Sequence, residues 1–220
     1  MNAKSTVSVV PEEDSSSANA NDCYTIISLK WAEEDLVRVT ASVGFSCLIR
    51  PSYLETLPTA ALLEDAELDE EGRLDLFHAA ECYRAEIRAL ASVARSEQCR
   101  NQMQYKLEAK GFSRSAARRA LDRLTELNFI NDRRFARAWL NIRTLRSGEG
   151  RIRLIGGLVS RGINRDLAVE CVDEFLSEIP EEELLLRARE KCLRQGKNRD
   201  ETIRTLQNRG FLYSNIQKNV

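Results

Sequence analysis

Residues 107–112 read Leu-Glu-Ala-Lys-Gly-Phe, and the pattern returns as Leu-Val-Ser-Arg-Gly-Ile at 158–163 and as Leu-Gln-Asn-Arg-Gly-Phe at 206–211. The shared sequence is Leu-x-x-basic-Gly-apolar, and its three glycines lie 51 and then 48 residues apart. A period of this size is typical of chains built from stacked helical units, each of which buries its apolar face against the next. Such arrays form long binding surfaces, so the pattern favours a binding protein over an enzyme.

Each copy of the pattern has the features of a helix C-terminus. The basic residue suits the negative end of the helix dipole. The glycine suits the left-handed position after the last turn, and the apolar residue can pack back on that turn, as in a Schellman motif. Candidate N-caps stand eight residues before each leucine, at Cys99, Gly150 and Asn198. Asn198 and Glu201 have the spacing of a capping box, and Ser113 and Asn164 are suited to cap the helices that follow the first two copies.

A further helix is predicted before each of these starts. Apolar residues at three- and four-residue spacing predict helices over about 75–94, 132–146 and 181–195. The predicted fold is therefore mainly α, with three tandem three-helix units at residues 75–128, 129–178 and 179–220, the last one short. The alternative is a single irregular helical domain in which the three matches arose by chance. Their aligned starts and flanking helices favour the repeat.

The N-terminal third has a different composition. Residues 1–22 are polar and rich in Ser, Asn and Ala, which predicts a disordered tail. β-branched residues between 23 and 50 predict a small two- or three-stranded element, which we assign to residues 23–60. An acid-rich linker is expected over residues 61–74. No signal peptide or membrane-spanning run is visible, and the six cysteines form no Cys-x-x-Cys pair, so we expect a cytoplasmic protein with reduced, mostly core-facing thiols.

The net charge of −1 conceals an uneven distribution along the chain. Residues 1–80 hold 5 basic and 15 acidic residues, whereas residues 95–165 hold 17 basic and 6 acidic residues. The first two helical units are therefore expected to present a basic surface to phosphate backbones or to an acidic protein. The complementary charge makes the β element a candidate autoinhibitor of that surface. Docking on the first helical unit and binding a partner are the alternatives.

The strongest candidates for this basic surface are seven arginines of the second unit. They are Arg133, Arg134, Arg137, Arg143, Arg146, Arg151 and Arg153. Two glycines in the turn 147–150 would allow a partner's backbone to approach, and backbone N–H groups at the following helix start could hold a phosphate. Phe135 and Trp139 lie four residues apart, and we interpret them as core residues. Sequence-specific reading of bases is not expected.

No catalytic constellation is visible in the chain. The phosphate-binding Gly-x-x-x-x-Gly-Lys-Ser/Thr loop and the Gly-x-Ser-x-Gly nucleophile elbow are both absent from the sequence. The single histidine, His78, stands in a predicted helix beside Phe77 and Ala79, where a structural role is expected. We therefore expect a non-enzymatic protein with no metal or other cofactor.

The stretch from about residue 80 to residue 163 resembles the RecX family, the regulatory proteins that modulate the recombinase RecA. Residues 102–112, Gln-Met-x-x-Lys-Leu-x-x-Lys-Gly-Phe, resemble the family's Glu-Leu-x-x-Lys-Leu-x-x-Lys-Gly-Phe. Residues 131–136 resemble its Asp-x-x-Phe-Ala helix start, and residues 143–163 its Arg … Gly-x-Gly-Pro-x-Arg-Ile … Leu-x-x-Lys-Gly-Ile core. The order and spacing agree without a gap. Three positions depart from the pattern: Cys99 stands for Ser, Arg151 for Pro and Gly157 for Glu.

The resemblance implies tandem three-helix units and a non-enzymatic regulator in recombination, DNA repair and the SOS response. It implies binding to the RecA filament on single-stranded DNA, and inhibition of strand exchange, ATP hydrolysis and coprotease activity. The seven arginines are then expected to face the filament, with the protein acting as a monomer and using no membrane or small-molecule substrate. Two alternatives remain: a stand-alone helical DNA-binding protein, and a protein-only interaction scaffold.

Overall fold

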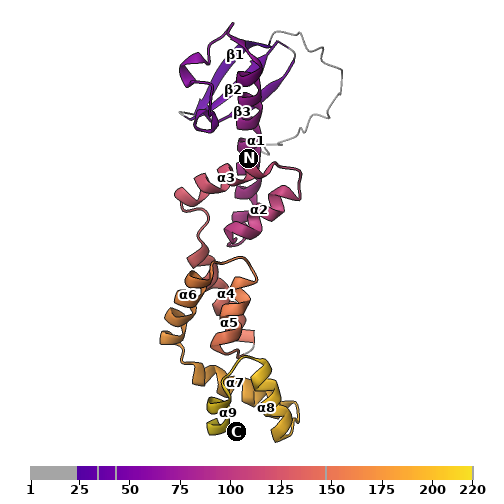
Figure 1. The fold of residues 1–220 in the computed structure, drawn as a ribbon, viewed down its shortest axis with the longest axis vertical. Coiled ribbons are helices and arrows are strands. Elements are labelled where there is room, and N and C mark those ends of the chain that lie inside the picture. Colours follow the sequence, from indigo (N-terminus) through magenta and orange to yellow (C-terminus); the bar gives the residue numbers. More distant parts are fainter. Residues whose placement is uncertain (1–23, 34, 43, 147, 220) are drawn as a thin grey trace, which may run out of the picture.

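The computed structural model describes residues 24–33, 35–42, 44–146 and 148–219. The tail predicted at 1–22 lies outside these residues. The described chain forms an elongated row: a β-sheet at one end, then helices that follow one another along the long axis to the C-terminus (Figure 1). The mainly α fold with a small N-terminal β element is confirmed.

The sheet has four antiparallel strands in the order β3-β2-β1-β4. They are β1 (Tyr24–Glu33), β2 (Leu36–Ala41), β3 (Ser46–Ile49) and β4 (Glu67–Leu68), with short 3-10 helices at Pro51–Tyr53 and Thr59–Ala61. The fourth strand and the first turn of helix α1 (Glu70–Val93) fall within residues 61–74, so the expected linker is wrong as a description of this segment. Asp69 caps α1 through the backbone N–H of Gly72, and Glu70 and Glu71 suit the helix dipole.

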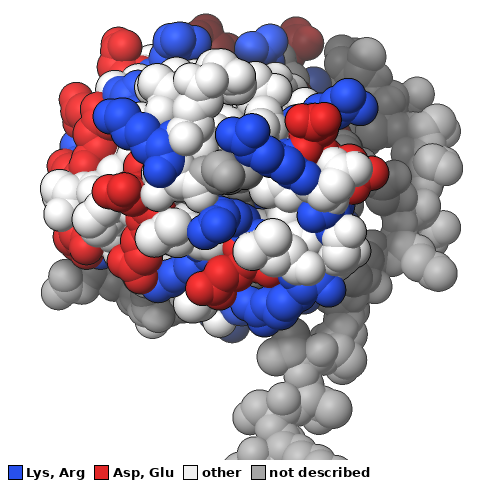
Figure 2. Space-filling model, turned by 90° about the horizontal axis from the view of Figure 1, so that it is seen from below, with Lys and Arg blue, Asp and Glu red and all other residues white. Residues whose placement is uncertain are grey.

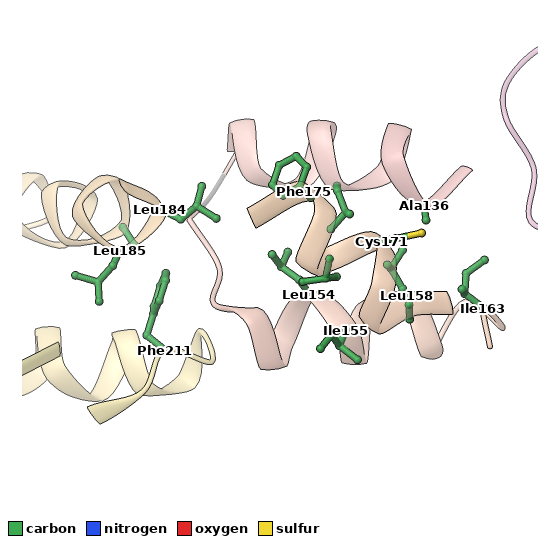
Figure 3. Packing of buried hydrophobic residues seen from close by; sticks show 14 of the residues in the cluster. Ala136, Leu154, Ile155, Leu158, Ile163, Cys171, Phe175, Leu184, Leu185 and Phe211 are labelled. Atoms are coloured by element: carbon green, nitrogen blue, oxygen red, sulfur yellow. The ribbon is translucent and has the colours of Figure 1, made fainter. Parts of the chain in front are cut away.

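Eight helices follow α1 among the described residues. They are α2 (Arg100–Glu108), α3 (Arg114–Glu126), α4 (Asp132–Arg146), α5 (Arg151–Val159), α6 (Arg165–Glu178), α7 (Glu181–Arg194), α8 (Arg199–Asn208) and α9 (Tyr213–Asn219). The predicted unit boundaries at 128 and 178 fall between helices. The division into three units remains a prediction, because one apolar cluster continues from α4–α6 into α7–α9 (Figure 3).

The repeated pattern ends the middle helix of each predicted unit. Gly111, Gly162 and Gly210 all have φ between +83° and +89°. The N–H of the following apolar residue donates to the carbonyl of the pattern's leucine, as from Phe112 to Leu107 at 3.3 Å, and the other two copies repeat this bond. These are the 6→1 bonds of a Schellman motif, so the predicted helix ends are confirmed. The predicted capping box of Asn198 and Glu201 is also present.

The middle helices α2, α5 and α8 meet end to end through two similar joints. In the first joint, the Cys99 thiol donates to the carbonyl of Arg161, and the N–H of Arg100 donates to Asp132. In the second, the N–H of Gly150 donates to the carbonyl of Arg209 at 2.9 Å, and the N–H of Arg151 donates to Glu181 at 2.8 Å. The C-terminal end of α5 therefore lies against the N-terminus of α2, and the C-terminal end of α8 lies against the N-terminus of α5. The repeat extends the row of helices through these contacts.

Alanine at Gly148 is expected to weaken the packing of α7 against the turn before α5, next to the second joint. A Cβ there would lie 1.9 Å from the carbonyl oxygen of Leu184, which is backbone and cannot rotate away. We expect Gly148→Ala to lower the free energy of unfolding by about 1–3 kcal/mol, measured by urea denaturation. Gly156→Ala is the matched control: it is inside α5 with open space around it and should raise stability by about 0.5–1 kcal/mol. Equal effects of the two substitutions on the free energy of unfolding would contradict this close packing of α7 on Gly148.

The sheet is held on the first helices by an apolar cluster and by buried charges. Val37, Val39 and Ile49 of the sheet pack with Leu76 and Ala79 of α1. The described sheet therefore docks on the first helical unit, one of the three roles considered for it. It lies at the end of the row next to α1, and α2 and α3 separate it from α4–α6, so it does not cover the arginines of the second unit (Figure 1).

Asp75 gives this docking region a pH dependence. Its buried carboxylate accepts hydrogen bonds from the backbone N–H groups of Glu55, Thr56 and Leu57 at 2.8–3.0 Å. Burial alone would raise the pKa of Asp75, but these bonds outweigh it and lower the pKa below the ordinary value of 3.8. The ionised Asp75 carboxylate therefore stabilises the folded state fully above its ordinary pKa of 3.8, and this stabilisation is lost as the pH falls through the lowered pKa. We expect the stability difference between the wild type and Asp75→Asn to shrink below about pH 4 in urea denaturation. A difference independent of pH would contradict this.

Candidate functional site

Five of the described arginines of the predicted basic surface fall into two sets, and Arg134 lies apart from both. The first set, from α4 and from the start of α5, faces the acidic side of α6. Arg133 pairs with Glu170 and Glu174, both at 2.6 Å, Arg137 with Glu178, and Arg151 with Asp173. Hydrogen bonds from these arginines hold the pKa of Asp173 and of Glu178 below their ordinary values. The acidic side of α6 thus largely neutralises this set.

Arg134 has a position of its own, at the connection between α3 and α4. Its guanidinium pairs with Glu97 at 2.5 Å and donates to the backbone carbonyls of Asn128 and Phe129. These contacts hold together the segment that leads into α4. The side chain of Arg146 lies outside the described residues.

The second set surrounds a groove between α4 and α5 with a volume of about 320 Å³. Arg143 and Arg153 both approach the buried carboxylate of Glu149, Arg143 with two hydrogen bonds at 2.7 and 2.9 Å and Arg153 at 3.4 Å. Arg161 enters from the end of α5, with its guanidinium 4.7 Å from the centre of the Trp139 ring. Three cations and one carboxylate leave the groove positively charged.

Trp139 forms the aromatic wall of this groove. It packs on the core from the α4 side, as its interpretation as a core residue requires, yet it is only partly buried and also lines the groove. Arg143 lies over the same ring at 5.9 Å, so two guanidinium groups contact one indole. Gly157 makes this packing possible, because a Cβ there would lie 2.5 Å from the ring atom Cη2. The departure of Gly157 from the family pattern therefore has a steric reason.

The sequence did not identify Arg161 as a site residue. Its position is the basic residue of the second Leu-x-x-basic-Gly pattern, which we interpreted only as a favourable charge at a helix end. Its guanidinium does donate to the carbonyl of Gly157 at 2.8 Å, within the last turns of α5. The overlooked signal is that Arg161 directly follows the helix that carries Arg153, so both arginines belong to one short segment of the chain.

The phosphate site suggested at the start of α5 is already occupied by the chain itself. Glu181 accepts the N–H of Arg151, and the carbonyl of Arg209 accepts that of Gly150. The glycines at 148 and 150 admit the backbone of the C-terminal helices rather than that of a partner. The suggestion is wrong because the backbone N–H groups of Gly150 and Arg151 already have hydrogen-bond acceptors within the second joint.

The C-terminal end of the row mixes both signs of charge. Figure 2 shows Lys and Arg side chains interleaved with Asp and Glu on this end of the molecule. Of the helices that the structure describes, none is long and apolar enough to cross a membrane. In contrast to this end of mixed charge, the α4–α5 groove places three guanidinium groups around one aromatic ring. This arrangement suits phosphate or carboxylate ligands.

Known proteins resemble this chain in sequence and in fold. It is 35% identical over 140 residues to the Regulatory protein RecX of Treponema pallidum (strain Nichols), over 64% of this chain and 85% of the relative. It is 32% identical over 137 residues to the Regulatory protein RecX of Chlorobaculum tepidum, over 60% and 83% of the two chains. No protein-family model matches the chain.

Two solved structures share the fold. A crystal structure of regulatory protein RecX superposes with a TM-score of 0.69 at 17% identity, over 88% of this chain and 97% of the other. The crystal structure of RecX from Lactobacillus salivarius gives 0.55 at 18% identity, over 63% and 93%.

Proposed function

Because this chain belongs to the RecX family of regulatory proteins, we propose that it regulates the recombinase RecA by binding along the RecA filament on single-stranded DNA. In this proposal it inhibits strand exchange, ATP hydrolysis and coprotease activity, and so acts as a negative regulator of recombination, DNA repair and the SOS response. It acts in the cytoplasm as a monomer, without a cofactor and without catalysis of its own.

The positive groove between α4 and α5 is the observation that carries the proposal. Arg153 and Arg161 each keep part of their hydrogen-bonding capacity free of acidic partners within the described chain. Arg153 approaches Glu149 at 3.4 Å and donates one hydrogen bond to the carbonyl of Asn208, and Arg161 donates to the carbonyl of Gly157. Guanidinium groups bind phosphates and carboxylates in a bidentate manner. We infer that this groove contacts the DNA backbone or an acidic surface of RecA.

The other arginines of the predicted surface have supporting roles in this proposal. Groups of the filament can replace the acidic partners that Arg133, Arg137 and Arg151 have on α6. This replacement occurs only where the free energy of binding to the filament exceeds the free energy lost with those ion pairs. Exposed ion pairs are weak, so this exchange is physically accessible. Arg134 and Arg143 are the further described members of the surface on α4, and Arg146 remains a predicted member from the sequence.

The elongated row explains how one molecule affects many RecA subunits. A row of helices joined end to end by backbone contacts can follow a filament groove and contact several subunits at once (Figure 1). Linked contacts of this kind gain affinity by their effective concentration. In this proposal, a molecule bound across several subunits restrains their movement relative to one another and thereby lowers the rate of ATP hydrolysis.

Co-sedimentation with RecA filaments tests the proposed binding. RecA is assembled on single-stranded poly(dT) with a non-hydrolysable ATP analogue, and the full chain is added at increasing salt. We expect it to pellet with the filament, less with bare single strands, and progressively less as the salt concentration rises. Equal or tighter binding to bare duplex, with a sequence preference, would favour the stand-alone DNA-binding protein. No binding to filament or DNA would favour the protein-only scaffold.

A further inference from the structure

A second hollow, between the C-terminal end of α4 and helix α7, is larger than the α4–α5 groove. Its volume is about 510 Å³. One wall carries Arg187, Lys191 and Arg194 of α7, and the other carries Leu145 of α4 and Gly148 of the following turn. None of the six predicted site residues whose side chains the structure describes lines it.

The basic wall is a single face of α7. Residues 187, 191 and 194 are spaced by four and then three positions, which places them above one another on the helix. Arg187 pairs with Glu183 at 2.5 Å and Arg194 with Glu190 at 3.4 Å, and all four side chains are about half exposed or more. Both ion pairs join neighbouring turns of the same helix and are exposed to water. A ligand carboxylate can therefore replace the glutamate in each pair at a small cost in free energy. The acidic partners of Arg133, Arg137 and Arg151 instead belong to a different helix, α6.

The opposite wall exposes a large apolar side chain. Leu145 is 80% exposed, more than the other large apolar residues of the described chain. The neighbouring Thr144 is buried and bonds the carbonyl of Leu140, so the backbone holds Leu145 pointing outward. The hollow thus combines three cations with an apolar contact, whereas the α4–α5 groove combines its cations with an aromatic ring.

The two hollows face opposite sides of α4. Successive residues of an α-helix turn by about 100°, so Leu145 lies roughly 160° from Arg143 around the helix axis. A ligand in one hollow therefore leaves the other accessible.

We propose that the α4–α7 hollow binds an acidic segment of a partner protein, with carboxylates on Arg187, Lys191 and Arg194 and an apolar side chain against Leu145. A protein segment fits better than nucleic acid for two reasons. Among the described residues that line it, none has an aromatic side chain on which a base could stack. Glu190 stands on the basic wall, where it would repel closely spaced phosphates but can be avoided by carboxylates separated by apolar residues. This inference goes beyond the proposed function and does not depend on RecA.

Fluorescence anisotropy with two labelled peptides tests the inference on the full chain, without RecA. The probe is Asp-Glu-Leu-Asp-Glu-Leu-Asp-Glu, and the comparison peptide has Ser in place of both Leu. We expect the double variant Arg187→Glu, Arg194→Glu to bind the probe at least about tenfold more weakly, because two favourable charges become repulsive. Leu145→Ser should lower the affinity for the probe about tenfold, because the apolar contact is lost. It should change the affinity for the Ser peptide little.

The matched control is the double variant Arg165→Glu, Arg204→Glu, which changes the net charge equally at exposed positions of α6 and α8. It should bind the probe within about twofold of the wild type, since long-range charge effects are screened by salt. Circular dichroism melting establishes that each variant is folded. Equal weakening by both double variants, or no effect of Leu145→Ser, would overturn the inference. The hollow would be assigned to nucleic acid instead if oligo(dT) displaced the probe and if the binding of oligo(dT) were also lost in the double variant Arg187→Glu, Arg194→Glu.

Discussion

The double variant Arg153→Glu, Arg161→Glu should bind the RecA filament about 100-fold more weakly than the wild type, and should lose inhibition of RecA at concentrations where the wild type inhibits. Each substitution removes a hydrogen bond to a charged group, worth about 1.5–3 kcal/mol, and replaces it by repulsion. Two such losses account for two or more orders of magnitude in affinity. The measurement is co-sedimentation of the full chain with RecA on poly(dT), with inhibition of RecA assayed in parallel.

Arg143 is left unchanged in this variant for a structural reason. Its guanidinium makes two hydrogen bonds to Glu149, which is 5% exposed, and loss of that partner would leave a buried carboxylate unpaired. The double variant Arg165→Glu, Arg204→Glu again serves as the charge-matched control and should inhibit RecA like the wild type. If the groove variant retains wild-type filament affinity while its circular dichroism is unchanged, the groove is not the interface.

Glu86→Ala is expected to lower the free energy of unfolding by about 3–5 kcal/mol, because it removes the buried half of an ion pair. Arg50 would keep only its more exposed partner Asp35, and the buried Tyr53 hydroxyl would lose its acceptor. Glu86 of α1 is 2% exposed and accepts hydrogen bonds from Arg50 at 2.9 Å and from the Tyr53 hydroxyl at 2.8 Å. Burial alone would lower the pKa of Arg50, but Glu86 and Asp35 outweigh it and raise the pKa. Burial and Glu86 together raise the pKa of Tyr53. Loss of the carboxylate therefore detaches the sheet from α1, and urea denaturation measures the cost.

Two further variants separate the parts of this effect. Glu86→Gln keeps an acceptor for Tyr53 and should cost less than Glu86→Ala. Asp35→Asn acts on the exposed side of the network, where Asp35 pairs with Arg50 and Arg123 at 2.6 and 2.5 Å, and should cost no more than about 1 kcal/mol. A loss below about 1 kcal/mol for Glu86→Ala would show that the network does not hold the sheet in place.

Helix ends were predictable from the sequence because their determinants are local. Gly162 and Asn198 act within one turn of their own positions, so the repeated pattern located the ends of the middle helices correctly. The start of α1 was placed five residues too late, since an acidic first turn after Asp69 has the same composition as an acidic linker. The strand β4 escaped prediction because it has only two residues and pairs with β1 more than forty positions earlier.

The electrostatic state of the candidate site could not be predicted in the same way. Arg133 pairs with acids 37 and 41 positions away, and Arg151 with one 22 positions away, so their neutralisation depends on how α6 packs against α4 and α5. The sequence identified Arg143 and Arg153 as candidates, but not their shared contact with Glu149. Arg161 joins them only because the C-terminal end of α5 lies beside the middle of α4, at Trp139.

The central claim, that this chain restrains RecA on single-stranded DNA, is tested most directly by the rate of ATP hydrolysis by RecA filaments as the full chain is titrated well below the RecA concentration. The account predicts strong inhibition at substoichiometric levels, because one molecule contacts several RecA subunits. An unchanged rate at equimolar protein, with RecA filaments intact in electron micrographs, would contradict it.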